Sequence, residues 1–276
     1  MVRVLRACTR GAGDTVVALD EWRALAPGLA EEVACDWALT LGDVYPPGAA
    51  SHVVAAVCAD GAPAALKVFW PHREAEQEAA ALRRWDGDGA VRLLREDEER
   101  HALLLERCEP GTFLSDAADD PLGVLIELLP RLWKSAEGFR TLAEEAELWL
   151  EGDVPRAPYA DVAAALIREL APTQGEPVLL HQDLHGQNVL AAQREPWLAI
   201  DPKPLAGERE FSVAPIVRSF ELGHTRREAL YRLDRLTSEL GLDRERARGW
   251  TIAQTVAWSG GSEWIESHLE TVSWLL

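Results

Sequence analysis

Residues 178–201 read VLLHQDLHGQNVLAAQREPWLAID, and this stretch decides the fold and the chemistry that we expect. Short apolar runs, typical of buried strands, flank a loop that is dense in polar side chains. Asp183 and Asn188 lie five residues apart in this loop, and Asp201 follows Asp183 by 18 positions at the end of the next apolar run. We expect these side chains to converge on a cleft at the strand ends.

The three side chains carry the oxygen atoms that phosphoryl transfer needs. Asp183 would accept the proton of an attacking hydroxyl group. Asn188 would give Mg²⁺ an uncharged oxygen ligand, and the Asp201 carboxylate would bridge the metal ion to the β- and γ-phosphates. The alternative is a loop of capping residues, which requires the H-x-D-x-x-x-x-N spacing and the downstream Asp201 to coincide by accident.

The segments around this stretch predict an α+β fold with two lobes. Residues 1–35 are expected to form a helical arm packed on the fold, with Trp22, Leu25 and Leu29 buried. Residues 36–108 predict a β-β-β-α-β-β lobe with an antiparallel sheet and one main helix. Residues 109–276 predict a larger, mostly helical lobe. The expected helices include 71–85 in the first lobe and 213–222, 225–240, 243–258 and 262–276 in the second.

The composition is that of a folded protein and excludes several classes of partner. Lys and Arg number 28 against 46 Asp and Glu, a net charge of −18, which disfavours nucleic acids and anionic membranes. The four cysteines form no C-x-x-C pair. No stretch approaches the length of a membrane span, and the N-terminus does not read as an export signal. We therefore expect a cytoplasmic protein with reduced thiols.

The residues quoted above resemble the aminoglycoside phosphotransferases, relatives of the protein kinases. LLHQDLHGQNVL followed by REPWLAIDPKPLAGEREF is especially similar to the streptomycin 6-kinase and hydroxyurea phosphotransferase branch. The similarity continues through ALKVFWPHREAEQEAAALRRWDGDGAVRLL and ALLLERCEPGTFL and covers roughly residues 36–222. It implies a protein-kinase-like fold, ATP and Mg²⁺ as cofactors, and a small-molecule hydroxyl acceptor, in a monomer or homodimer.

The resemblance also implies roles for two charged residues of the first lobe. Lys67 would place its ammonium group against the α- and β-phosphates, on the strand face opposite Leu66 and Val68. Of the acids in the following helix, helical spacing favours Glu78 as the partner of Lys67, because it shares a face with apolar residues.

Three further parts of the site are expected from the resemblance. Gly48 and Ser51 stand where a loop would cover the phosphates, although a plain hairpin loop is nearly as good an interpretation. The backbone groups of Glu106 and Cys108 would bind an adenine edge at the hinge between the lobes. His181 and His185 would support the loop around Asp183.

Two residues depart from the family pattern. Gln182 stands where the family usually has glycine, and Ser212 stands where it usually has an acidic residue. We expect Ser212 to cap the helix that begins near residue 213.

These features predict an ATP-dependent phosphotransferase acting on a small, cationic acceptor, most simply a streptomycin-like aminoglycoside. Asp153, Glu208 and Glu210 are candidates for binding the cationic group at the mouth of the acceptor site. A metabolite kinase of the choline, homoserine or sugar type remains an alternative. A protein substrate is disfavoured because Asp201 leads directly into Pro202-Lys203-Pro204 without an activation loop.

Two alternatives come from other classes of protein. His181 and His185 have the i, i+4 spacing of a zinc pair in a hydrolase, but Gln182 stands where that motif needs glutamate. A kinase-like protein that binds without catalysis would have to lack Lys67, Asp183 or Asp201, and all three are present.

Overall fold

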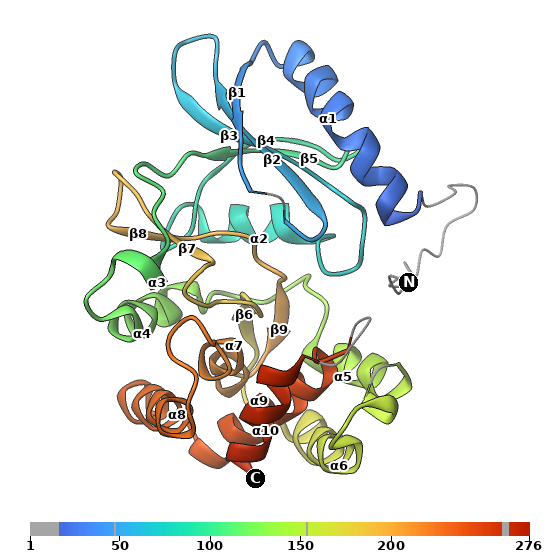
Figure 1. The fold of residues 1–276 in the computed structure, drawn as a ribbon, viewed down its shortest axis with the longest axis vertical. Helices are drawn as coiled ribbons and strands as arrows, with labels where there is room; N and C mark the ends of the chain where they lie inside the picture. Colours follow the sequence, from blue (N-terminus) through green and yellow to red (C-terminus); the bar gives the residue numbers. More distant parts are fainter. Residues whose placement is uncertain (1–16, 47, 153, 261–264) are drawn as a thin grey trace.

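The computed structural model describes residues 17–46, 48–152, 154–260 and 265–276, which form a small sheet lobe and a larger helical lobe (Figure 1). The chain builds the sheet lobe first and then remains in the helical lobe to its end. This is the two-lobed α+β architecture predicted from the sequence.

The first lobe is built on a five-stranded antiparallel sheet in the order β1-β2-β3-β5-β4. The turn between β2 and β3 contains Gly61, whose φ of 88° lies in the left-handed region that glycine adopts without strain. One helix separates β3 from β4, so the predicted β-β-β-α-β-β order is confirmed. The elements are β1 (Thr40–Val44), β2 (Ser51–Val57), β3 (Pro63–Phe69), α2 (Glu78–Trp85), β4 (Leu93–Asp97) and β5 (Ala102–Glu106).

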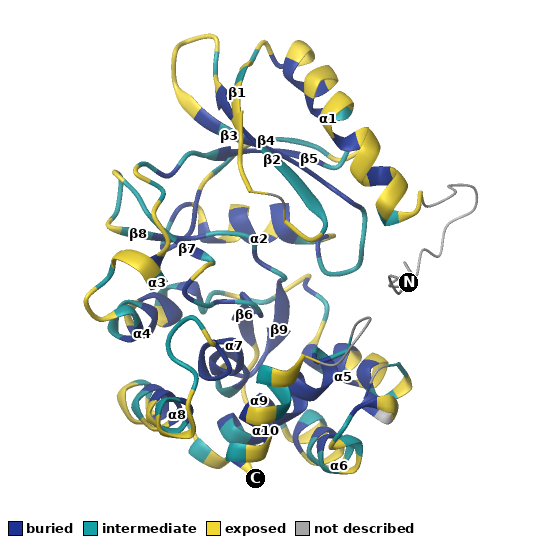
Figure 2. Ribbon diagram, viewed as in Figure 1, coloured by how far each residue is buried: buried dark blue, intermediate teal, exposed yellow. Residues whose placement is uncertain are grey.

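The two faces of this sheet bury different partners. Leu66 and Val68 of β3 belong to one apolar core with helix α1 (Leu19–Asp36), whereas Phe69 belongs to another with α2 and the second lobe. Figure 2 shows that α1 is buried on its inner side and exposed elsewhere. Because side chains alternate along a strand, Lys67 points away from α1 and toward α2.

The expected buried stripe of α1 is only partly right. Trp22 is buried, but Leu25 is 56% exposed and Leu29 is only partly buried. The helix instead packs through Ala26, Ala30 and further residues on the same face. These small side chains allow a close approach to the sheet.

The second lobe packs around α9, which contacts α6, α7, α8 and α10. The helix expected over 213–222 is reduced to α7, which follows a short 3-10 helix. Ser212 does not cap it, because its hydroxyl group donates to the Arg209 carbonyl oxygen at 2.5 Å. The helices are α3 (Leu114–Ala117), α4 (Pro121–Leu132), α5 (Leu142–Glu151), α6 (Ala160–Leu170), α7 (Ala214–Val217), α8 (Arg226–Leu240), α9 (Arg244–Ala257) and α10 (Glu266–Leu275), with 3-10 turns at Val154–Arg156, Ala171–Thr173 and Arg209–Val213.

Two short antiparallel strand pairs sit in the helical lobe and hold the polar stretch. β6 (Val178–Leu180) pairs with β9 (Leu205–Gly207), and β7 (Val189–Ala191) pairs with β8 (Trp197–Ala199). β9 was not expected from the sequence. Hydrogen bonds join Ala199 of β8 to Gly89 and Val91 of the first lobe, so residues 200–204 lie beside the junction of the lobes. Among the described residues, no helix has the length and apolar character needed to cross a membrane.

Candidate active site

The loop of residues 181–188 is fixed at its start by bonds to neighbouring segments. The Lys203 N–H donates to the His181 carbonyl oxygen at 3.0 Å. Gln182 has a φ of 65°, in the left-handed region that non-glycine residues rarely adopt. Its carbonyl oxygen accepts a hydrogen bond from Gln254 Nε2 of α9 at 3.0 Å. The bond to α9 holds the backbone immediately before Asp183, and the positive φ explains why a glycine suits the position of Gln182.

Two cations flank the Asp183 carboxylate. Lys203 Nζ lies 2.5 Å from Oδ2, and Arg218 Nη2 lies 3.6 Å from Oδ1. Burial opposes ionisation of this carboxyl, but the nearby positive charges, that of Lys203 above all, outweigh it and lower the pKa of Asp183. The residue is therefore held as a carboxylate, the form that can accept a proton or orient a hydroxyl group.

Asn188 and Asp201 present oxygen atoms beside Asp183. Asn188 Nδ2 donates to the Asp183 carbonyl oxygen at 2.8 Å, which leaves the Oδ1 oxygen for another ligand. Asp201 Oδ1 lies 2.6 Å from Lys67 Nζ, and the Asp201 side chain is 44% exposed. Asp201 also has a left-handed φ of 56°, a strained conformation of a kind that clusters at functional sites.

The ion pair between Lys67 and Glu78 is present in the first lobe. Lys67 Nζ lies 2.7 and 2.6 Å from the two carboxylate oxygens of Glu78, and both side chains are buried. Burial lowers the pKa of Lys67, but the charges of Asp201 and Glu78 outweigh it, so the net shift is upward. Lys67 is thus a fixed ammonium group that joins the first lobe to Asp201 of the second.

Glu78 is the first residue of α2, which is shorter than the predicted helix 71–85. Residues 73–77 form turns instead. The Gln77 side chain donates to the Gly138 carbonyl oxygen at 2.8 Å and accepts from the Arg140 N–H at 2.9 Å. These bonds to the second lobe compete with helix formation before Glu78. The positive end of the helix dipole therefore lies at this carboxylate.

The oxygen donors fit a hard divalent cation that is shared with phosphate groups. Asn188 Oδ1 and the exposed side of the Asp201 carboxylate are the kind of ligands that Mg²⁺ prefers. In the described part of the chain, no group of three or more His, Cys, Asp or Glu side chains could hold a metal ion. A cation at this place would therefore complete its coordination with phosphate oxygens and water.

His181 and His185 do not form a zinc pair. The His181 Nε2–H donates to the Ile200 carbonyl oxygen at 2.9 Å, and burial lowers the pKa of His181 to about 4. The His185 Nδ1–H donates to Glu221 Oε1 at 2.7 Å. The two rings are bonded to different segments, which corrects the zinc alternative and agrees with a role in supporting the loop.

The hinge residues lie where β5 ends. The Glu106 carboxylate binds Arg194 at 2.7 and 2.9 Å, so its side chain ties the hinge to the β7–β8 turn. Cys108 is buried, and burial raises the pKa of its thiol to about 12. Among the described residues, no hydrogen bond uses the Cys108 backbone N–H. That donor is therefore available to a ligand at the hinge.

Gly48 lies in the turn between β1 and β2, and Ser51 is the first residue of β2. A Cβ at Gly48 would come within 2.7 Å of Ser51 Oγ, so the turn leaves little room for a side chain there. Within the described ranges, no hydrogen bond or ion pair joins the two residues to Asp183 or Asp201.

Two of the acidic residues expected at the acceptor mouth are engaged by other segments of the chain. Asp153 lies outside the described residues. Glu208 is 3% exposed, and its carboxylate accepts hydrogen bonds from Arg246, the Gly175 N–H and Trp250. Glu210 accepts from the Asp243 N–H at the start of α9. The expectation is wrong for Glu208, because its buried carboxylate serves the packing of α9, whereas for Glu210, which is partly exposed, it stays a prediction.

The basic surroundings of Asp183 were missed by the sequence reasoning. Arg218 is buried, with Nη1 2.6 Å from Gln254 Oε1 and its guanidinium 4.9 Å from the Trp258 ring. Burial lowers the pKa of Arg218 to about 10, so it stays charged at neutral pH. Lys203 could have been found, because the chain has only three lysines and this one is two residues after Asp201.

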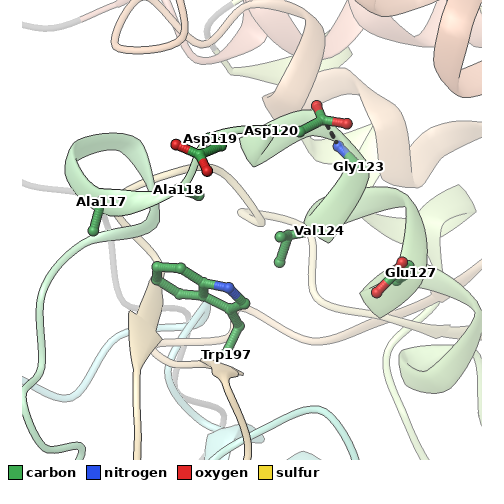
Figure 3. A pocket seen from close by; sticks show the side chains of 8 residues that line it. All are labelled: Ala117, Ala118, Asp119, Asp120, Gly123, Val124, Glu127 and Trp197. Atoms are coloured by element: carbon green, nitrogen blue, oxygen red, sulfur yellow. Dashed lines mark hydrogen bonds between the residues drawn. The ribbon is translucent and has the colours of Figure 1, made fainter.

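A separate pocket of about 370 Å³ lies where α4 begins, beside Trp197 of β8 (Figure 3). Its acidic side chains include Asp120, which caps α4 through the Gly123 N–H at 3.0 Å. None of the residues around Asp183 contributes to this pocket, so it is distinct from the site described above. Its lining is Ala117, Ala118, Asp119, Asp120, Gly123, Val124, Glu127 and Trp197.

Comparisons with known proteins agree with this arrangement. The family model described as aminoglycoside/hydroxyurea antibiotic resistance kinase matches residues 36–264. A hydroxyurea phosphotransferase from Kitasatospora aureofaciens is 43% identical over 247 residues, which cover 83% of this chain and 71% of that protein. A streptomycin 6-kinase from Streptomyces griseus is 42% identical over 252 residues, which cover 84% of this chain and 81% of that protein. Among solved structures, a choline kinase from Streptococcus pneumoniae shares the fold with a TM-score of 0.64 at 16% identity, over 91% of this chain and 97% of that one.

Proposed function

The chain belongs to the aminoglycoside/hydroxyurea antibiotic resistance kinase family, and on this premise we propose that it transfers the γ-phosphoryl group of ATP to a hydroxyl group of a streptomycin-like aminoglycoside. Phosphorylation would inactivate the antibiotic. The observation that carries the proposal is the meeting of Lys67, Asp183, Asn188 and Asp201 between the lobes. We propose a cytoplasmic site of action, where ATP is available, in a monomer or homodimer.

One residue of the site acts on the nucleophile, and the others act on the phosphates. Asp183 orients the acceptor hydroxyl group and takes its proton as the new bond to phosphorus forms. Lys67, held by Glu78, binds the α- and β-phosphates as a fixed point charge. Asn188 and Asp201 would hold Mg²⁺, which when bound neutralises charge on the phosphate oxygens. Catalysis then rests on positioning and charge stabilisation.

The nucleotide would be held at the hinge and under the first lobe. The Cys108 N–H and a backbone group of Glu106 bind the adenine edge, and the turn with Gly48 and Ser51 covers the phosphates. The unpaired state of the Cys108 N–H among the described residues supports this placement.

Hydroxyurea is a second candidate acceptor. Lys203 and Arg218 flank Asp183, so a small neutral acceptor meets no charge repulsion at the reacting hydroxyl group. The guanidino groups of streptomycin would have to lie away from these two cations. A relative at 43% identity carries the name hydroxyurea phosphotransferase.

A coupled assay of ADP release tests the proposal. The purified protein is supplied with MgATP and one acceptor at a time: streptomycin, hydroxyurea, choline or a simple sugar. We expect Mg²⁺-dependent turnover with streptomycin, insensitive to a zinc-selective chelator, and a product carrying one added phosphoryl group by mass spectrometry. Turnover with hydroxyurea alone favours the second candidate. Turnover only with choline or a sugar overturns the antibiotic-resistance proposal.

A further inference from the structure

The second lysine of the site, Lys203, lies beside both reacting groups of the proposed reaction. The chain has three lysines, and two of them, Lys67 and Lys203, point at the carboxylates between the lobes. Lys203 Nζ lies 2.5 Å from Asp183 Oδ2 and 3.6 Å from Asp201 Oδ2. Prolines on both sides of Lys203, and the bond from its N–H to the His181 carbonyl oxygen at 3.0 Å, fix its backbone.

This position lies on the path of the transferred group. The acceptor hydroxyl group binds at Asp183, and the phosphates bind on the side of Asp201. A phosphoryl group that passes between them must pass the Lys203 ammonium group, which contacts both carboxylates. Its transition state spreads negative charge over the equatorial oxygens, where a fixed cation is most effective.

The other basic side chains near Asp183 are already engaged. Arg218 is anchored by Gln254 and lies against the Trp258 ring. His185 donates to Glu221, and Lys67 is balanced by Glu78. Within the described chain, the only carboxylates within 4.0 Å of Lys203 Nζ are those of Asp183 and Asp201. When a hydroxyl group engages the first and a cation the second, the Lys203 charge becomes available to the nucleotide.

We propose that Lys203 is a catalytic residue whose ammonium group contacts the γ-phosphoryl group of ATP, an inference that rests on the proposed function. In the step itself, the acceptor oxygen forms a bond to the γ-phosphorus, and the bond from that phosphorus to the bridging oxygen breaks. The electron pair of the broken bond leaves on ADP, and the acceptor proton passes to Asp183. Lys203 keeps its protons throughout and stabilises the negative charge on the phosphoryl oxygens during the transfer.

Nucleotide binding without acceptor tests this contact directly. Isothermal titration calorimetry with MgATP and MgADP compares the wild type, Lys203→Met and Lys203→Arg. In Lys203→Met we expect MgATP affinity to fall roughly tenfold or more while MgADP affinity stays nearly unchanged, because only ATP has the γ-phosphoryl group. Lys203→Arg keeps the charge and should retain part of the preference for ATP. If ATP and ADP weaken equally in Lys203→Met, the residue is structural and the proposal is overturned.

A double-mutant comparison distinguishes a contact between Lys203 and the γ-phosphoryl group from simple neutralisation of the Asp183 charge by Lys203. In the Asp183→Asn background the carboxylate charge is gone, so a Lys203 that merely offsets it has nothing left to offset. We expect Lys203→Met still to reduce the preference for ATP over ADP in this background. If its effect vanishes there, Lys203 is only a counter-ion and the proposal fails.

Turnover provides the kinetic test, with a matched control in the same chain. With the acceptor identified by the ADP-release screen, kcat of Lys203→Met should fall about 10²–10³-fold. Lys134→Met, which removes a partly exposed pair with Asp88, should keep wild-type kcat. Retention of kcat by Lys203→Met overturns the proposal. Because the binding arms need no acceptor, failure of every acceptor in the screen leaves the test of Lys203 intact.

Discussion

Glu208→Ala should destabilise the fold and leave recognition of the acceptor unchanged. The Glu208 carboxylate is 3% exposed and accepts from Arg246 Nη2 at 2.7 Å, Arg246 Nε at 3.1 Å and the Gly175 N–H at 3.0 Å. It also accepts from the buried Trp250 Nε1–H. The substitution leaves the buried Trp250 indole N–H without an acceptor and the Arg246 guanidinium without its carboxylate partner.

The expected loss in the free energy of unfolding follows from the burial of the Glu208 carboxylate. Removing one partner of a buried ion pair costs about 3–5 kcal/mol. Arg246 is 26% exposed and can recover part of its hydration, which places the loss at the lower end, about 3–4 kcal/mol. For a chain of this size that corresponds to a fall in Tm of roughly 6–16 °C.

Urea denaturation measures the change in folding stability, and steady-state kinetics at a permissive temperature measure recognition of the acceptor. Glu210→Ala is the matched control, since this partly exposed acid makes one bond to the Asp243 N–H and should change stability by less than about 0.5 kcal/mol. The acceptor KM of Glu208→Ala should equal that of the wild type. Wild-type stability with a raised acceptor KM would instead show that Glu208 binds the acceptor.

Two further perturbations test the site and its support. Glu78→Gln removes the charge that holds Lys67 at 2.6 Å, so kcat/KM for ATP should fall roughly 10- to 100-fold in steady-state assays with the acceptor KM unchanged; an unaltered kcat/KM for ATP would contradict the pairing. Burial opposes ionisation of Glu221, but the bond from His185 outweighs it and lowers the pKa of Glu221 to about 2. The ionised carboxylate therefore stabilises the fold above its ordinary pKa of 4.5, and this contribution is lost as pH falls toward 2. In urea titrations the stability advantage of the wild type over Glu221→Gln should shrink across that range, and a constant difference would exclude this linkage.

The sequence predicted the parts of the molecule that depend on local pattern. Alternation along β3 placed Lys67 opposite Leu66 and Val68, and helical spacing selected Glu78 from three acids. The spacing from Asp183 to Asn188 predicted two residues that the structure holds together, with the Asn188 side chain donating to the Asp183 carbonyl oxygen at 2.8 Å. In each case the determining neighbours are close in the sequence or share one element.

The predictions that were wrong concern features that depend on contacts between distant segments. The helix before Glu78 is shortened by bonds from Gln77 to Gly138 and Arg140, 61 and 63 residues away. Glu208 is acidic in the sequence, but burial against Arg246, 38 residues later, makes it structural. No local pattern reports such pairings, because the partners meet only when segments that are distant in the sequence pack together.

In the proposed reaction Asp183 acts on the acceptor and not on the nucleotide. Asp183→Asn preserves the shape of the side chain while removing its charge, and its two flanking cations remain. The most direct measurement combines single-turnover phosphoryl transfer with MgATP affinity in this variant. We expect transfer to be abolished while MgATP binds as tightly as in the wild type or more tightly. Near-normal transfer by Asp183→Asn would contradict the role assigned to Asp183.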